Sequence, residues 1–416
     1  LDFVNERIQK RGPDYTGVYK HKNYSFIHNL LSITGQFTKQ PFKSEEVVCM
    51  FNGQIYNYKE FGNYESDGEC LIPLYEKYGV DFVKKLDGEF AILLVDFKSD
   101  VLIVSTDIFS TKPLYMAVDD YDKFGFSSYA SSLQRMNFNN IYKIPANKTY
   151  LFRLSKFELL KELSVKDFDL NQHKDTFIDW NNAFSNSMTK RATNIREHLY
   201  LGLSSGYDSG VIACELFKRK IPYKVYTVAG KEHPDILKDR HDIIKEFAEV
   251  ETLDIRADRE RCRQYIHNNI DPFRFNIYTT DKSKYDRYFN ANLHDDYGAI
   301  GLTYICEHAK KDNRKIYLSG QGADEVFADY GHNGECKGRH SNFFESSQEA
   351  FLVKEEYIAG AFGLETRYPF LDQDVVQEFL WLKPELKNKH YKSVLHNYLV
   401  KNNFPFEENK KRGFSV

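Results

Sequence analysis

The chain has 416 residues, of which 42% are hydrophobic and 15% aromatic, so it can bury more than one core and predicts two or three domains. The formal net charge is −3, which gives no overall positive field for a nucleic-acid backbone. Nucleic acid is therefore not expected as a partner. No apolar run approaches the length of a membrane-spanning helix, so we expect no membrane partner either.

The six cysteines are scattered and form no CxxC pair, and no secretory segment is evident. This pattern predicts reduced thiols and a cytoplasmic location. Residues 2–9 are typical of the end of an amphipathic helix already under way, and the chain stops at Val416 directly after a basic turn. We therefore expect upstream residues to be missing and the C-terminus to be shortened.

The first part of the chain favours strands. Between Tyr24 and about Leu154, short β-branched and aromatic runs alternate with turn residues, and a helical stretch near residues 70–78 makes this half α+β. The strand-like runs are residues 47–51, 90–96, 101–105 and 148–154. Residues 155–174 are polar without a clear period and predict the passage between domains. We expect one domain over residues 1–160 and another over 175–416.

From Asp175 onward, strands alternate with helices of ten or more residues. This alternation predicts a doubly wound, largely parallel α/β sheet, in which ligands bind beyond the carboxyl ends of the strands.

The first strand of this half leads into a loop of small residues. Residues 201–210 are LGLSSGYDSG, an apolar strand end followed by the loop and a helix. The loop amides and the helix N-terminus can hold a pyrophosphate. The spacing is not that of the P-loop of kinases and GTPases. The alternative is that Asp208 or Ser209 only caps the helix.

A second segment repeats this design. Residues 316–330 are IYLSGQGADEVFADY, with two acidic residues opening a helix. Asp208 and Asp324 would then lie at carboxyl ends of strands in one sheet, where their oxygens can share Mg²⁺ with nucleotide phosphates. The alternative is that Asp324 and Glu325 complement a helix dipole.

These segments resemble motifs of the asparagine synthetase family. Residues 204–209 resemble its SGGxDS pyrophosphate loop, with Ser205 replacing a glycine, and residues 319–325 resemble its SGEGxDE segment, with Gln321 at the Glu position. Residues 363–372 (GLETRYPFLD) are similar to its GVExRxPFLD, and residues 411–414 to its Lys-x-Gly-Phe turn.

The amino-terminal half is similar to class II glutamine amidotransferases. Residues 11–14 resemble their RGPD, residues 51–58 (FNGQIYNY) their FNGEIYN, and residues 87–91 their DGxFA. The resemblance implies an Ntn-hydrolase-like α+β sandwich followed by an α/β domain of the adenine nucleotide alpha hydrolase type.

The resemblance also assigns a glutamine site. It places Asn52 and Gly53 at the oxyanion hole and Asp67 at a glutamine-binding carboxylate. The alternative for Asn52-Gly53 is a plain hairpin turn. The family's nucleophile is an amino-terminal Cys well upstream of RGPD, whereas this chain has Leu1, and Leu30 stands where the family has an Arg that grips the glutamine carboxylate. We therefore expect a degenerate glutaminase half.

For the second half, the resemblance implies an ATP-dependent amide ligase. Such an enzyme adenylates a small-molecule carboxylate, releases pyrophosphate, and lets ammonia, drawn from glutamine in the family, displace AMP. ATP and Mg²⁺ are the implied cofactors. The assigned phosphate-binding residues are Ser204, Gly206, Asp208, Ser209, Ser319 and Gly320. Val228 and Ala229 would meet the adenine, and Asp208 and Asp324 would hold the metal.

Two residues would act on the reaction itself. Lys411 would stabilise charge at the α-phosphate, with a solvated basic turn as its alternative. Gln321 lies at the reacting centre by resemblance, but Gln cannot act as a general base, so the acceptor is left open among aspartate, a sugar acid and a specialised metabolite.

Three wider questions remain open at this point. A β-lactam-synthetase-like enzyme would use the same adenylation and close a ring with the substrate's own amine. A non-catalytic regulatory homologue would explain Leu30, Ser205 and Gln321 as losses. A homodimer is left open.

Overall fold

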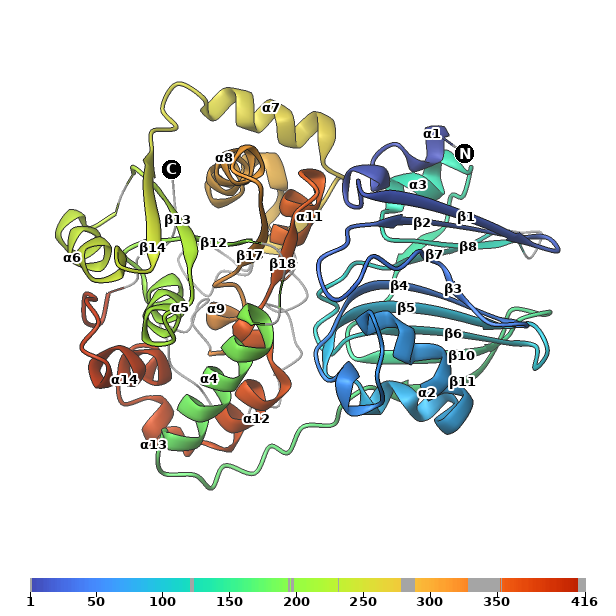
Figure 1. The fold of residues 1–416 in the computed structure, drawn as a ribbon, viewed down its shortest axis with the longest axis horizontal. Helices are drawn as coiled ribbons and strands as arrows, with labels where there is room; N and C mark the ends of the chain where they lie inside the picture. The colour runs from blue at the N-terminus through green and yellow to red at the C-terminus, as the bar shows by residue number, and fades with distance from the viewer. Residues whose placement is uncertain are drawn as a thin grey trace. The chain divides into compact units, whose positions relative to one another are not determined.

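The computed structural model describes residues 2–119, 123–193, 195, 198–230, 232–277, 289–327, 352 and 354–410. The chain divides into two compact units (Figure 1). The first consists of Leu1–Asp167 and Asn194–Arg196, and the second of Phe168–Thr193 and Glu197–Val416.

An antiparallel six-stranded sheet forms the centre of the first unit, in the order β11-β10-β6-β5-β4-β3. The strands are β3 (Phe42–Lys43), β4 (Val47–Ile55), β5 (Gly88–Asp96), β6 (Val101–Thr106), β10 (Lys148–Arg153) and β11 (Glu158–Ser164). The four predicted strand runs and the predicted helix, which is α2 (Leu71–Tyr78), are confirmed.

The alternation of side chains along these strands builds two cores. Phe51 and Ile92 point to one face, where they pack with Leu71 and Leu74 of α2. Their neighbours point to the other face, which packs against side chains of two small sheets, among them Phe26. Those sheets are the hairpin β1 (Tyr15–His21) with β2 (Tyr24–Leu30), and β7 (Tyr115–Val118), β8 (Phe124–Ser127) and β9 (Ile141–Lys143). The first unit is thus the expected α+β sandwich.

One local expectation was wrong and a second was met only in part. Residues 155–174 are not all a linker, because residues 158–164 form β11, an edge strand. Most of its side chains are exposed, so no apolar alternation marks it. The helix end expected over residues 2–9 is present as α1 (Asp2–Asn5) but stops at Asn5, and a 3₁₀ turn follows at Ile8–Lys10.

The second unit contains a fully parallel five-stranded sheet in the order β14-β13-β12-β17-β18. The strands are β12 (His198–Gly202), β13 (Tyr223–Val228), β14 (Ala248–Leu253), β17 (Arg314–Leu318) and β18 (Glu365–Arg367). The predicted doubly wound sheet is confirmed.

Helices cover both faces of this sheet (Figure 1). Those on or near it are α4 (Ile178–Ala192), α5 (Tyr207–Lys218), α6 (Pro234–Ile244), α7 (Arg259–Asn269), α8 (Tyr297–Lys311), α9 (Ala323–Val326), α11 (Lys354–Ala361), α12 (Gln373–Trp381), α13 (Pro384–Lys387) and α14 (Ser393–Lys401). A further hairpin pairs β15 (Arg274–Ile277) with β16 (Phe289–Asn292).

The order of the strands sets the place of the site. From β12 the chain continues to β13 and β14 on one side, and later adds β17 and β18 on the other side of β12. The order therefore reverses between β12 and β17, and such a reversal opens a crevice at the carboxyl ends of the two strands. The two loops of small residues follow these two strands.

Candidate functional site

The loop after β12 is folded back on the start of α5. Ser204 N donates to Ser209 Oγ at 3.0 Å, and Gly206 N donates to Ser204 Oγ at 3.1 Å. Arg240 of α6 fixes the loop from within the protein, because its Nη1 donates to the carbonyl oxygens of Ser204 and Gly206 at 2.5 and 2.9 Å. Gly210 is needed beside it, since a Cβ there would lie 2.4 Å from Arg240 Nη2. The loop is thus rigidly braced.

The loop after β17 closes against the first one. Gly322 has a φ of +101° and its N donates to Glu325 Oε2 at 2.8 Å, which explains the glycine at this turn. A Cβ on Gly320 would lie 3.1 Å from Asp208 Cβ, so the two loops are in close contact. The expectation that they share one edge of the sheet is borne out by this geometry.

A lysine that the sequence analysis did not select joins the two strand-end acids. Lys392 Nζ lies 2.7 Å from Asp208 Oδ1 and also forms an ion pair with Asp324 Oδ1. The Lys392 side chain is only 4% exposed, and its backbone is left-handed with a φ of +46°. It occupies the N-cap of α14, where Ser, Thr, Asp or Asn is usual. That unusual N-cap is the one sequence signal that could have drawn attention to it.

A cavity of about 240 Å³ opens between these elements. Among the predicted residues, it is lined by Ser204, Asp208, Ser209, Gly320, Gln321 and Asp324. The N-terminal half of α8 supplies an apolar wall that includes Ala299 and Leu302.

Four other predicted residues of this site lie outside this lining. Gly206 supports the first loop, and the fully buried Ser319 begins the second. Val228 is buried at the end of β13, and the next residue, Ala229, is exposed. Lys411 lies outside the described residues.

Two further carboxylates line the cavity and were also missed. Burial, together with the charge of Asp324, raises the pKa of Glu325 to about 8. Burial raises the pKa of Glu355, which accepts a hydrogen bond from Ser319 Oγ. Because Ser319 Oγ also accepts from Gln321 N at 2.9 Å, Glu355 is linked through one serine to the backbone of Gln321.

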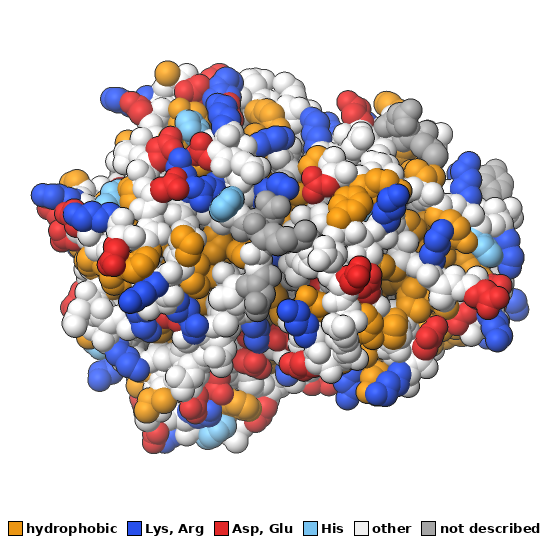
Figure 2. Space-filling view, viewed as in Figure 1, with side chains coloured by type: hydrophobic (Ala, Val, Ile, Leu, Met, Phe, Trp, Pro, Cys, Tyr) orange, Lys and Arg blue, Asp and Glu red, His pale blue; other side chains and the backbone are white. Residues whose placement is uncertain are grey.

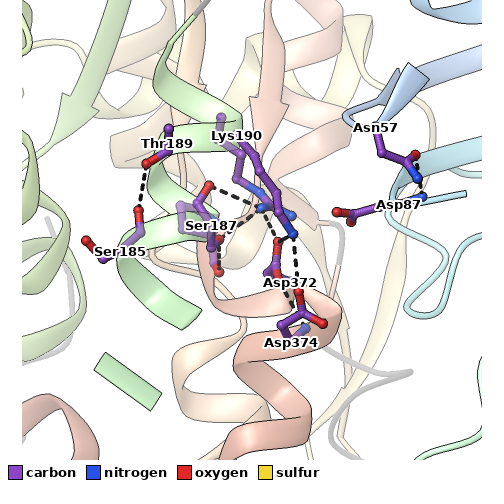
Figure 3. Close-up of polar contacts among 10 residues, drawn as sticks. Asn57, Asp87, Ser185, Ser187, Thr189, Lys190, Asp372 and Asp374 are labelled. Atoms are coloured by element: carbon purple, nitrogen blue, oxygen red, sulfur yellow. Dashed lines mark hydrogen bonds and ion pairs between the residues drawn. The ribbon is translucent and has the colours of Figure 1, made fainter. Parts of the chain in front are cut away.

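The segment at residues 363–372 has a structural role. Arg191 Nη1 lies 2.8 Å and Lys190 Nζ 3.1 Å from Asp372 Oδ2, and Lys190 also lies 3.5 Å from Asp374 (Figure 3). Burial opposes ionisation of Asp372, but Arg191 and Lys190 outweigh it and lower the pKa of this carboxyl. Asp372 also caps α12 by accepting from Asp374 N. The cluster fixes α4 to the start of α12.

In the first unit, Asn52 and Gly53 lie inside β4, so the hairpin-turn alternative is wrong. Gly53 has a φ of +141°, and a Cβ there would lie 1.9 Å from the carbonyl oxygen of Glu89. Within the part of the chain that the structure describes, the buried Asn52 Nδ2 has no hydrogen-bond partner. A buried amide donor without an acceptor is costly, which is typical of a group that meets a ligand.

The other glutamine-site candidate is tied to the same strand. Asp67 is buried, and its Oδ2 accepts from Gln54 Nε2 at 2.9 Å and from Ile55 N at 2.8 Å. Leu30, at the end of β2, is buried with 7% exposure. Asn57 Oδ1 accepts from Asp87 N at 2.9 Å, which links the ends of two predicted motifs (Figure 3).

The described residues contain no cluster of three or more His, Cys, Asp or Glu side chains able to hold a metal. They likewise include no helix long and apolar enough to cross a bilayer. On the face seen in Figure 2, acidic and basic side chains are interspersed, and no single basic surface stands out.

The fold and the sites define a class: an amidotransferase-type sandwich combined with a parallel-sheet unit in which two loops of small residues meet at the carboxyl ends of neighbouring strands. Comparison with known families agrees with this class. The glutamine amidotransferase domain family matches residues 1–163, and the asparagine synthase family matches residues 180–344. The chain belongs, as a divergent member, to the asparagine synthetase family.

Curated relatives match along most of the chain. A putative glutamine-hydrolysing asparagine synthetase 1 of Methanocaldococcus jannaschii is 28% identical and is matched over 88% of this chain and 70% of that protein. The glutamine-hydrolysing asparagine synthetase 1 of Arabidopsis thaliana is 25% identical over 97% of this chain and 71% of its own length. Among solved structures, a glutamine phosphoribosylpyrophosphate amidotransferase of B. subtilis has a TM-score of 0.28 at 14% identity, covering 52% of this chain and 64% of that chain, which is too low to add to the assignment.

Proposed function

We propose that this protein is a glutamine-dependent amide ligase that adenylates a small-molecule carboxylate with ATP and transfers ammonia to it. The observation that carries the proposal is the meeting of Asp208 and Asp324 on one buried cation, Lys392, at the carboxyl ends of β12 and β17. Two carboxylates held together in a cavity repel each other and need a cation between them. Such a group of charges in a cleft is typical of a functional site.

The phosphates of ATP would bind across the two loops. Ser204, Gly206 and Ser209 supply the first half of the cradle, and Ser319 and Gly320 the second. Val228 and Ala229 would border the adenine. A carboxylate reacts with an amine only when its oxygen becomes part of a good leaving group, and joining it to AMP with release of pyrophosphate provides that group.

The two acids also fit a divalent cation. Both already contact the same ammonium nitrogen, so their oxygens lie within reach of one ion. Mg²⁺ bound with ATP would be held by Asp208 and Asp324 and would neutralise phosphate charge. Lys392 would then be available to the phosphates, and Lys411, which lies outside the described residues, is our candidate for the charge at the α-phosphate.

In the family an amino-terminal Cys attacks glutamine, and no residue of this sequence takes that place, so the first unit is proposed to release ammonia from glutamine only together with such a thiol. Asn52 Nδ2 and the Gly53 amide are proposed to hold the oxyanion formed during glutamine hydrolysis, and Asp67 to bind the glutamine itself. Free ammonia would be an alternative nitrogen donor. We further propose that the two compact units are the two functional domains and that the protein acts in the cytoplasm.

The group that removes a proton from the incoming amine is proposed to be Glu355. Gln321 has no acid–base function at neutral pH, whereas Glu355 lines the same cavity and is linked to the Gln321 backbone through Ser319. The acceptor carboxylate would lie between these residues and the apolar wall of α8.

ATP–pyrophosphate exchange with a panel of carboxylates tests the proposal. Exchange should require Mg²⁺ and one particular carboxylate, and Asp208→Asn should abolish it. Asp242→Asn is the matched control, because Asp242 is exposed on α6 and pairs only locally with Lys245. Exchange that persists undiminished in Asp208→Asn would refute the site.

A further inference from the structure

The amide of Ser205 in the phosphate loop already binds a carboxylate. Ser205 N donates to Glu232 Oε2 at 2.6 Å, and Ser205 Oγ donates to the same oxygen at 2.5 Å. Ser205 Oγ also accepts from His233 N at 3.1 Å. Ser205 is only 2% exposed, so this contact is an inner part of the loop.

The contact between Ser205 and Glu232 lies where the loop would bind a phosphate. Ser205 lies two residues before α5, where loop amides and the helix N-terminus attract an anion. Glu232 comes from the segment after β13, outside α5, and presents to this loop the kind of oxygen that a phosphate would present. A carboxylate and a phosphate that share one amide repel each other, so only one of them can occupy it.

The serine itself fits this arrangement. A glycine at position 205 would keep the backbone N–H and lose the second hydrogen bond to Glu232. Ser205, which replaces the family's glycine, therefore has a hydroxyl group that binds one particular residue, Glu232. Arg240 holds the carbonyl oxygens of Ser204 and Gly206 from the other side, so the loop has a second brace besides Glu232.

We propose that the Glu232 carboxylate competes with the nucleotide phosphates for the Ser205 amide. Glu232 must leave this amide before ATP binds. The inference rests on the proposed function and adds to it a residue that sets nucleotide affinity. The carboxylate satisfies the loop amide in the absence of nucleotide and raises the concentration of ATP needed to fill the site.

Titration calorimetry with Mg²⁺–pyrophosphate and with Mg²⁺–ATP tests this inference on the whole protein. Glu232→Gln and Ser205→Ala should each tighten pyrophosphate binding by about tenfold, the effect of one charge-assisted hydrogen bond. Alanine is preferred to glycine because Ser205 has no positive φ and the change then removes only the hydroxyl. The double variant should bind no tighter than the better single variant, since both changes remove one shared contact.

Asp235→Asn is the control. Asp235 is an exposed acid three positions further on, so its loss changes the net charge equally without touching Ser205, and affinity should stay the same. Melting curves confirm that each variant is folded. If the unchanged protein binds pyrophosphate and Glu232→Gln binds it equally or more weakly, Glu232 braces the loop and the inference is overturned. If neither the unchanged protein nor any variant binds nucleotide or pyrophosphate, the proposed function itself fails.

Discussion

Lys392 Nζ and Asp208 Oδ1 lie 2.7 Å apart although 184 residues separate them in the chain. The same ammonium group also pairs with Asp324, so one lysine joins the two loops on which the nucleotide site depends. Because Lys392 is buried between two acids, removing its charge leaves both carboxylates without their shared partner.

Lys392→Met should therefore lower both activity and stability. The variant lacks the positive charge that Lys392 would offer to the phosphates. We therefore expect ATP–pyrophosphate exchange to fall by about 100-fold or more, as when one preorganised electrostatic group is removed. The two carboxylates that remain repel each other, so the melting temperature should fall and should recover more on adding Mg²⁺ than that of the unchanged protein. Lys401→Met, at the exposed end of the same helix, is the control and should change neither quantity. Full exchange activity in Lys392→Met would exclude a role for this lysine.

Much of this site could be predicted from the sequence, because its parts are local. A strand, a loop of small residues and an acid at the start of a helix are encoded within about ten consecutive residues, and the same design appears twice. The short β-branched and aromatic runs also predicted the strands β4, β5, β6 and β10 correctly. What joins the parts is not local: Lys392 reaches the acids only through tertiary packing and a left-handed backbone.

Other features were hidden for different physical reasons. β11 exposes both polar and apolar side chains, so no alternation distinguishes its residues from a linker. The Asn52–Gly53 pair is typical of a hairpin, yet it continues a strand because Gly53 fits against the Glu89 carbonyl, where a Cβ cannot. Glu232 lies 27 positions from Ser205, and nothing in the sequence around either residue marks their contact.

Glu355→Gln should separate the two half-reactions. Loss of the proposed base should slow amide formation by about 100-fold and leave ATP–pyrophosphate exchange nearly unchanged. Burial raises the pKa of Glu355. As the pH is lowered, Glu355 of the unchanged protein should therefore become protonated, and amide formation should slow, at a higher pH than is usual for a glutamic acid. The Glu355→Gln variant should lose this decrease of the rate at low pH. Glu385→Gln, on the exposed start of α13, should keep it. Equal loss of exchange and amide formation would contradict the assignment.

Asn52→Ala should affect only the glutamine-dependent reaction. Removing one oxyanion donor costs about 100- to 1000-fold in comparable sites. In a version extended at the amino terminus so that it carries the family's Cys nucleophile, the rate supported by glutamine should fall accordingly, and the rate supported by ammonium should remain. Asn63→Ala, an exposed asparagine of the same unit, is the control. If both nitrogen sources lose the same factor, the effect is on folding and not on the oxyanion.

Asp372→Asn should destabilise the second unit. It removes the buried negative charge that Arg191 and Lys190 share, and breaking such a pair costs about 3–5 kcal/mol. The folded-state pKa of Asp372 is lowered, so its contribution is present above the ordinary pKa of an aspartic acid and is lost as the pH falls through the lower folded value. Urea unfolding should thus show a large difference at neutral pH that shrinks under acid conditions. Asp374→Asn, which is largely exposed, should show a small difference at every pH.

Transfer of ¹⁸O from the labelled acceptor carboxylate to the nucleotide product tests the central claim most directly. Once the exchange assay has identified the acceptor, the protein is given that acid with both carboxylate oxygens labelled, together with ATP, Mg²⁺ and a nitrogen source. Adenylation predicts that one labelled oxygen appears in AMP and none in pyrophosphate. Label in inorganic phosphate with formation of ADP would show an acyl phosphate instead and would contradict the account.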